Sequence, residues 1–113
     1  GFMSCIFCDI ASGKIKAEVV FEDQDVIAFK DLSPVSPTHL LIIPKIHIES
    51  AKEINSDNSK VIAKIFETIS MLSTKLNLDS FRIVNNCGES AGQTVKHLHF
   101  HLIGGRKFTW PPG

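Results

Sequence analysis

The 113-residue chain carries 12 basic and 12 acidic residues, so its formal net charge is zero. A chain with balanced charge is not expected to have the strongly basic surface by which proteins bind nucleic-acid polymers. No apolar segment approaches the roughly 20 residues needed to span a membrane. The length and the hydrophobic fraction of 43% fit a single domain over residues 1–113 with one core. We therefore expect a pocket for a small ligand, no polymer-binding groove and no membrane contact.

Cysteine usage argues against a disulfide framework. Cys5 and Cys8 form a C-x-x-C pair, whereas Cys87 stands alone, and no secretion signal precedes them. Thiols or metal ligands are therefore expected, in a cytoplasmic or nuclear protein. Residues 1–2 precede Met3 and are interpreted as an expression remnant.

The first half of the chain predicts a short helix followed by three strands. The helix is expected over residues 5–13, where Gly13 is a plausible stop. Residues 19–23 and 26–29 indicate a hairpin, and the prolines of residues 32–37 indicate a loop. The apolar run 39–44 ends at a proline, as a buried strand does.

The second half predicts one long helix and two more strands. Apolar residues recur at steps of three and four over residues 61–76, after several N-cap candidates. Strands are expected over 81–85 and 95–103, with a polar loop between them and a non-regular tail over 106–113. The fold class is therefore α+β: an antiparallel sheet of about five strands, one long helix on a face and a short N-terminal helix.

The last predicted strand carries three alternating histidines. His97, His99 and His101 should share one face, because side chains alternate across a strand. Apolar residues fill the other face, so packing explains that side but not three imidazoles in a row. Two chemistries suit them: three imidazoles can hold a catalytic metal, or a neutral imidazole can attack phosphorus.

A glycine-bearing loop over residues 88–94 leads directly into this strand. Its backbone N–H groups and the Thr94 hydroxyl are suited to hold an anion beside His99. The loop favours nucleophilic catalysis, although it leaves the metal alternative open.

The sequence His97-Leu98-His99-Phe100-His101-Leu102-Ile103 resembles the histidine triad (HIT) motif. Further segments resemble the Hint branch of that superfamily, in order along nearly the whole chain: Cys5–Cys8, Phe21–Asp23, Phe29–Pro34, Pro37–His39, Ile43–His47, Gly92–Val95, Gly104–Arg106 and Trp110–Gly113. The resemblance implies a HIT-like fold and a homodimer whose two sheets join into one.

The resemblance also implies a reaction. A purine nucleoside phosphoramidase would release AMP or GMP through a covalent nucleotidyl-histidine, with His99 as nucleophile and no cofactor for the chemistry. His101 would contact the phosphate or the bridging atom, and His39 and His97 would form a supporting network. The implied nucleotide-binding residues are Phe7, Ile10, Ile15, Phe29, Asp31, Leu32, Asn85, Gly92, Gln93, Thr94, His99 and His101.

Plainer roles remain open for some of these residues. Asp31 would also serve as a turn cap, Phe7 and Ile10 as ordinary core, and Asn85 as a strand end that turns the chain. The loop beginning at Asn85 is one residue longer than is usual for the branch.

The resemblance further implies a structural zinc site, because some triad proteins hold zinc with such a cysteine pair and two histidines. The corresponding residues are Cys5, Cys8, His47 and His97. A closed four-ligand site would leave His99 free for chemistry. The alternative is that both cysteines pack as small hydrophobes, with His97 in the imidazole network.

Three other functions remain open at the level of sequence. A dinucleoside polyphosphate hydrolase would act on phosphorus–oxygen bonds in the same pocket. A nucleotide-binding adaptor would use the same residues with little turnover. A metalloenzyme would hold a catalytic metal on the three histidines.

Overall fold

The computed structural model describes residues 4–113, so the interpretation of residues 1–2 lies outside it. The helices are α1 (Ile6–Ala11) and α2 (Ser59–Lys75), with short 3-10 turns η1 (Ala51–Glu53) and η2 (Glu89–Ala91). The strands are β1 (Val19–Glu22), β2 (Val26–Lys30), β3 (Thr38–Pro44), β4 (Phe81–Val84) and β5 (Phe100–Gly104).

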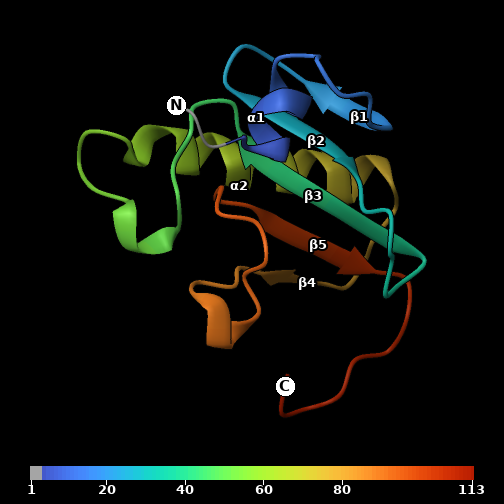
Figure 1. Cartoon of the computed structure of the whole chain (residues 1–113). Coiled ribbons are helices and arrows are strands. Elements are labelled where there is room, and N and C mark those ends of the chain that lie inside the picture. Colours follow the sequence, from blue (N-terminus) through green and yellow to red (C-terminus); the bar gives the residue numbers. More distant parts are fainter. Residues whose placement is uncertain (1–3) are drawn as a thin grey trace.

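All five strands lie in one antiparallel sheet of order β1-β2-β3-β5-β4. The central strand β3 pairs with β2 on one side and with β5 on the other. Helix α2 lies across one face of this sheet and α1 across the other (Figure 1). The α+β prediction, with one long and one short helix, is confirmed.

The main core lies between α2 and the sheet. Apolar residues of α2 recur at helical spacing, so they form one stripe that faces the strands. The buried residues of this core are Val26, Ala28, Leu40, Ile42, Ile48, Val61, Ile65, Ile69, Leu72, Leu98, Phe100 and Leu102. Leu98, Phe100 and Leu102, which alternate with the three histidines along the chain, therefore anchor the C-terminal segment in this core.

A smaller core lies on the opposite face of the sheet, where α1 packs. Phe7 and Ile10 of α1 contact the alternate residues of β2 and β3, which are Ile27, Phe29, Leu41 and Ile43. The Cys5 thiol caps the helix by accepting a hydrogen bond from the Cys8 N–H, at 3.3 Å. The helix ends before Gly13, whose φ of +83° suits a residue without Cβ. Because α1 has only six residues, it leaves part of this face to other side chains.

The strand predicted over residues 95–103 begins too early, because β5 begins only at Phe100. Its neighbour β3 ends at Pro44, and the chain bends at the next two residues. The segment before Phe100 therefore has no strand to pair with, and its backbone is held by other bonds, among them Leu98 N–H to the Ile48 carbonyl at 2.6 Å. The alternation of faces nevertheless continues through this segment, since Leu98 lies in the α2 core while the rings of His97 and His99 contact Phe7.

The other boundaries differ from prediction by one or two residues, apart from the two 3-10 turns, which were not predicted. The N-cap of α2 is Asn58, but its side chain accepts a hydrogen bond from Asn55 N–H and not from the helix. Within residues 4–113, none of the helices combines the length and the apolar character needed to cross a membrane.

Candidate functional site

The side chains of the histidine segment lie on the α1 face of the sheet and are largely withdrawn from water. His97 is 0% exposed and His99 is 6% exposed. The ring of Phe7 meets the rings of both residues edge-on, with centroids 6.0 and 5.1 Å away. The His99 and His101 rings are 5.2 Å apart. The short helix α1 therefore supplies an apolar wall against which the imidazoles are held.

Hydrogen bonds decide which ring nitrogen of His39 and of His101 carries the proton. The Val35 N–H donates to His39 Nδ1 at 3.1 Å, so a neutral His39 must carry its proton on Nε2. That Nε2–H donates to His101 Nδ1 at 2.9 Å, and the proton of His101 therefore sits on Nε2. Among the described residues, His101 Nε2 is a buried side-chain nitrogen without a hydrogen-bond partner. The chain of bonds thus delivers an unused N–H donor into the site.

Burial keeps these two histidines neutral near pH 7. Burial lowers the pKa of His101 to about 4, with smaller contributions from neighbouring His99 and His39. Burial also lowers the pKa of His39, although the carboxylate of Asp31 opposes that shift. The neutral forms that the hydrogen-bond chain requires are therefore the stable forms.

Asp31 stands at the outer end of this chain. Its Oδ2 lies 3.4 Å from His39 Nε2, and its Oδ1 accepts a hydrogen bond from Ser33 N–H at 2.7 Å. The turn-cap role left open by the sequence is therefore present. Asp31, His39 and His101 are called the histidine relay below.

His99 is held differently. Its Nδ1–H donates to the backbone carbonyl of His97 at 2.7 Å, so the neutral ring has its lone pair on Nε2. The carbonyl of His99 accepts a hydrogen bond from Asn85 Nδ2 at 2.9 Å. The amide nitrogen of Asn85 therefore fixes the backbone of His99, a role that its predicted phosphate contact did not include. An imidazole with a fixed Nδ1–H and a free Nε2 is suited to nucleophilic attack.

The loop between Asn85 and Thr94 is shaped by Gln93. Its Oε1 accepts from Gly88 N–H at 2.9 Å, and its Nε2 donates to the carbonyls of Glu49 and Val95 at 2.8 and 3.1 Å. Gly92 adopts φ +97°, which a residue with Cβ would adopt only with strain. Gln93 therefore holds the loop closed, while the exposed Thr94 remains available to a ligand.

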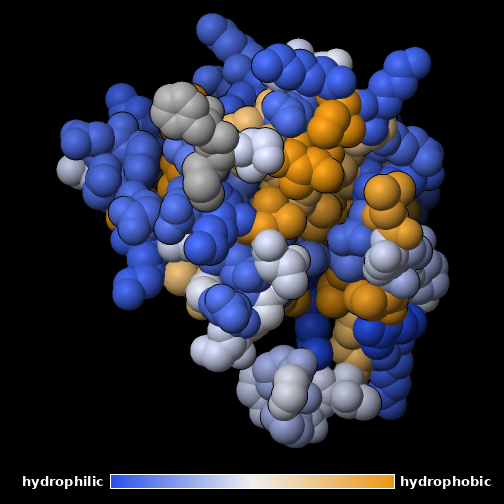
Figure 2. Space-filling model, in the orientation of Figure 1, coloured by the Kyte–Doolittle hydropathy of each residue, from blue (hydrophilic) through white to orange (hydrophobic). Residues whose placement is uncertain are grey.

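The residues predicted to wall the base pocket divide into two groups. Phe7, Ile10 and Phe29 are brought together in the smaller core. Ile15 is 40% exposed and Leu32 is 98% exposed, so Leu32 walls no pocket within this chain. Figure 2 shows hydrophobic side chains gathered at the surface over α1, β2 and β3, surrounded by hydrophilic ones.

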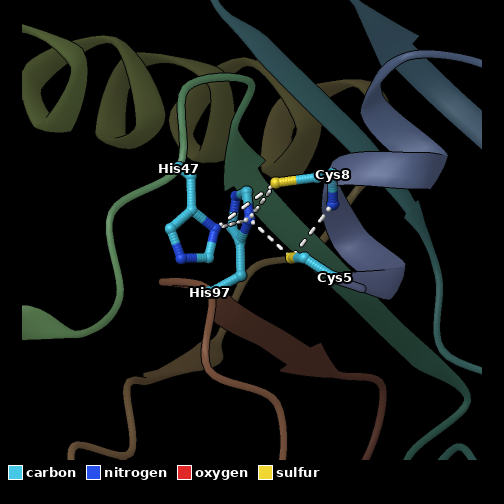
Figure 3. Close-up of side chains that lie close together, drawn as sticks. All are labelled: Cys5, Cys8, His47 and His97. Atoms are coloured by element: carbon cyan, nitrogen blue, oxygen red, sulfur yellow. Dashed lines mark hydrogen bonds between the residues drawn. The ribbon is translucent and has the colours of Figure 1, made fainter. Parts of the chain in front are cut away.

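A second group of ligating side chains lies beside the histidines. Cys5, Cys8, His47 and His97 come from α1, from the segment after β3 and from the segment before β5, and they converge (Figure 3). His97 Nδ1 lies 3.4 Å from each sulfur and 3.2 Å from His47 Nδ1, and Cys8 Sγ lies 3.3 Å from His47 Nδ1. These four residues are called the cysteine–histidine cluster below.

The geometry of the cluster fits zinc. Tetrahedral zinc places imidazole nitrogens about 3.3 Å apart, and sulfur and nitrogen about 3.6 Å apart, as follows from its bond lengths. His97 Nε2 donates to the Pro44 carbonyl at 2.8 Å, which leaves the lone pair of Nδ1 facing the other three ligands. Burial and the neighbouring Cys5 raise the pKa of the Cys8 thiol to about 11, whereas a bound dication would stabilise the thiolate. The donor set and its spacing are those of a Cys₂His₂ site.

The relay residues also lie within 4.8 Å of one another, but their hydrogen bonds do not suit a metal. His39 Nδ1 accepts from an amide, so its Nε2 carries the proton and has no lone pair to donate. Since His97 faces the cysteines and His101 faces His39, the three histidines of the motif do not converge on one point. The structure gives no support to a catalytic metal held by all three.

A cavity of about 1100 Å³ opens beside the cysteine–histidine cluster. Its lining includes cluster members and the loop residue Thr94, together with Lys14 and Lys96, which sequence reasoning did not single out. Sequence reasoning also missed the backbone groups of Val35 and Pro44. Every residue has a main-chain carbonyl and nearly every residue has an amide N–H, so the identity of a residue does not indicate that its backbone will bind a histidine. The thiols of Cys5, Cys8 and Cys87 are all free.

Comparisons with known proteins identify the family to which the chain belongs. A family model described as "Scavenger mRNA decapping enzyme C-term binding" matches residues 4–109. A HIT family hydrolase from Legionella pneumophila is 47% identical, with a TM-score of 0.95 over 97% of this chain and 100% of that chain. A histidine triad nucleotide-binding protein from Candida albicans is 32% identical, with a TM-score of 0.82 over 96% of this chain and 83% of that chain.

A zinc-bound histidine triad family protein from Mycobacterium smegmatis is 32% identical, with a TM-score of 0.79 over 95% of this chain and 78% of that chain. The family match thus covers nearly the whole chain, and the fold and the histidine motif agree with it. The protein belongs to the histidine triad family.

Proposed function

We propose that this protein is a nucleotide hydrolase that cleaves phosphorus–nitrogen bonds in purine nucleoside 5′-phosphoramidates. The observation that carries the proposal is the pairing of His99 with His101. His99 has its Nδ1–H fixed on a carbonyl and its Nε2 lone pair free, and His101 beside it presents a buried, unpartnered Nε2–H. The Legionella and Candida relatives, a hydrolase and a nucleotide-binding protein, support the reaction class and the ligand class.

The proposed reaction has two steps. His99 Nε2 attacks the α-phosphorus, the phosphorus–nitrogen bond breaks and the amine leaves with a proton taken from solvent, so that a nucleotidyl-histidine forms. Water then attacks phosphorus and breaks the new phosphorus–nitrogen bond, which releases AMP or GMP, restores the neutral imidazole and returns one proton to solvent. His101 Nε2–H is suited to donate a hydrogen bond to the phosphate or the bridging atom, where negative charge develops.

The nucleotide would lie on the α1 face. Asp31 is a hydrogen-bond acceptor suited to the ribose hydroxyls, and the hydrophobic surface over α1, β2 and β3 is suited to a purine (Figure 2). Thr94 and the loop that Gln93 holds closed lie at the start of the histidine segment, where the phosphate would be bound. The cysteine–histidine cluster would hold a structural zinc, as its donor set and the zinc-bound relative support.

The test measures hydrolysis of adenosine 5′-phosphoramidate and of diadenosine triphosphate. The wild type should cleave the phosphoramidate much faster, and His99→Ala should lose that turnover by at least about 1000-fold while it still binds AMP. Lys60→Ala, an exposed site on α2 across the sheet, is the matched control and should behave as wild type. Turnover that persists in His99→Ala would overturn the assignment.

The same measurement separates the alternative functions. Preferential cleavage of diadenosine triphosphate would indicate a dinucleoside polyphosphate hydrolase. AMP binding without cleavage of either compound would indicate a binding protein.

A further inference from the structure

His97 belongs to both parts of the site. Its ring lies in the cysteine–histidine cluster, while its backbone carbonyl accepts the Nδ1–H of His99 at 2.7 Å. A displacement of His97 therefore changes the acceptor that orients His99. The two residues are separated only by Leu98, whose side chain is buried on the other face of the sheet.

The sheet itself does not hold this carbonyl. The ladder between β3 and β5 stops at the pair Ile42 and Phe100, so residues 97–99 lie beyond it. Four other contacts hold the segment: His97 Nε2–H to the Pro44 carbonyl, Leu98 N–H to the Ile48 carbonyl, the approach of His97 Nδ1 to the cluster, and Asn85 Nδ2 to the His99 carbonyl. The approach of His97 Nδ1 to the cluster depends directly on the other cluster ligands. The bond from Leu98 N–H is also close to the cluster, because its acceptor Ile48 follows the ligand His47.

The third contact is strongest around a cation. Since the proton of His97 sits on Nε2, the lone pair of its Nδ1 faces His47 Nδ1 at 3.2 Å and the two sulfurs at 3.4 Å. Without a metal, this one lone pair can accept a single hydrogen bond, from a thiol S–H or from a His47 Nδ1–H, whereas a shared divalent cation attracts all four ligands at once. Occupancy of the cluster thus decides how firmly His97 is held.

We propose that the metal bound by the cysteine–histidine cluster positions the nucleophile His99 through the backbone carbonyl of His97. His97 is accordingly a positioning residue. The inference rests on the proposed role of His99 and adds that the cluster sets its tautomer. With the metal removed, His99 loses a fixed acceptor and its proton is distributed over both ring nitrogens.

The test compares the zinc-bound and zinc-depleted full chain. Chelation is practical because the cavity of about 1100 Å³ gives access to the cluster. Nitrogen-15 NMR of the imidazoles should show His99 as the Nδ1–H form with zinc and as a mixture of tautomers without it. The kcat for adenosine 5′-phosphoramidate should fall about 10- to 100-fold with little change in KM, as expected for a misplaced catalytic group.

Two cysteine variants sharpen the test. Cys8→Ser removes one ligand and should reproduce the zinc-depleted spectrum, whereas Cys8→His keeps four ligands and should restore the Nδ1–H form with zinc. Cys87→Ser is the matched control, since this thiol lies outside the cluster, and it should retain zinc and the wild-type tautomer. If Cys8→Ser fails to fold, stepwise chelation of the wild type, with folding followed by circular dichroism, gives the same comparison.

An unchanged His99 tautomer and a kcat within twofold of the zinc-bound value would overturn the proposal. A tautomer that responds to zinc in a protein that cleaves no phosphoramidate would support the coupling and contradict the proposed function. The two failures are therefore distinguishable.

Discussion

The cysteine–histidine cluster and the histidine relay are built from similar parts and are suited to different chemistry. Each gathers ligating atoms within 4.8 Å, and each contains two imidazoles. In the cluster, His97 donates its Nε2–H to a carbonyl and so presents a lone pair. In the relay, His39 accepts an amide N–H and so presents a proton. The backbone partner of one histidine in each group, His97 or His39, thus distinguishes metal binding from proton donation.

This difference shows that proximity of ligating residues does not by itself identify a metal site. The main-chain group behind each imidazole must be considered first, because it fixes which ring nitrogen is free. His99 lies between the two groups and follows the same rule, since a carbonyl holds its Nδ1–H. The comparison can be tested by changing one side at a time.

The largest effect is expected when zinc binding to the cysteine–histidine cluster is changed. Zinc should raise the free energy of unfolding of the wild type by about 4 kcal/mol when free zinc exceeds its Kd 1000-fold. Cys5→Ser should abolish this gain, because three ligands remain. Urea unfolding with and without zinc measures the difference, with Cys87→Ser as the control. An equal zinc response in Cys5→Ser would show that the metal binds elsewhere.

A core substitution should damage both sides together. Leu98 lies between His97 and His99, is 1% exposed and packs in the α2 core. Leu98→Ala should lower the free energy of unfolding by about 3 kcal/mol through a cavity. Zinc affinity and phosphoramidate turnover should both fall, in contrast to the selective effect of a ligand change. Calorimetry measures the stability, and a zinc-binding assay and a phosphoramidate hydrolysis assay measure the other two quantities. A fall in only zinc affinity or only turnover would contradict the idea that Leu98 anchors both His97 and His99.

The relay side can be separated from the metal side with two amide variants. His39→Gln keeps a donor near the position of Nε2, whereas His39→Asn keeps only an acceptor near Nδ1. His39→Asn should lower kcat by about 10- to 100-fold, since His101 loses the partner that fixes its tautomer. His39→Gln should lose less, and both should bind zinc as wild type does. The reverse order of the two variants would contradict the proposed direction of the hydrogen bonds.

The most gradual effect is expected from pH. The pKa of His101 is about 4 in the folded chain against 6.5 for an ordinary histidine, with burial as the main cause. Below pH 6.5 the unfolded chain binds a proton that the folded chain excludes, so the free energy of unfolding should fall as pH decreases from 6.5 towards 4. Above pH 6.5 this residue should contribute no slope. Urea unfolding with chelator present should show a shallower decline for His101→Asn than for wild type.

Sequence reasoning succeeded where the pattern is periodic and repeated. The apolar stripe of α2 and the runs that form β2 and β3 predicted elements close to those observed. The alternation of histidines with apolar residues also predicted correctly which side chains share a face. These features depend on which side chains are buried, and the local spacing of apolar residues in the sequence indicates that.

The start of β5 was mispredicted because a strand requires a partner. The alternation from Val95 onward is typical of a strand, but β3 ends at Pro44 and leaves residues 95–99 without a ladder. The roles of Asn85 and of the Val35 amide were not predictable for a related reason. Both depend on which main-chain group a distant segment brings close, at His99 and at His39.

The spread of the cluster along the chain has a consequence for the order of events during synthesis. Its ligands lie at residues 5, 8, 47 and 97 of a 113-residue polypeptide. A ribosome that has not yet added His97 has made at most three of them, so a nascent chain cannot complete the site. The fourth ligand is added only two residues before His99, the proposed nucleophile. The complete set of ligands and this histidine therefore become available almost together, and a chain that ends before residue 97 has neither.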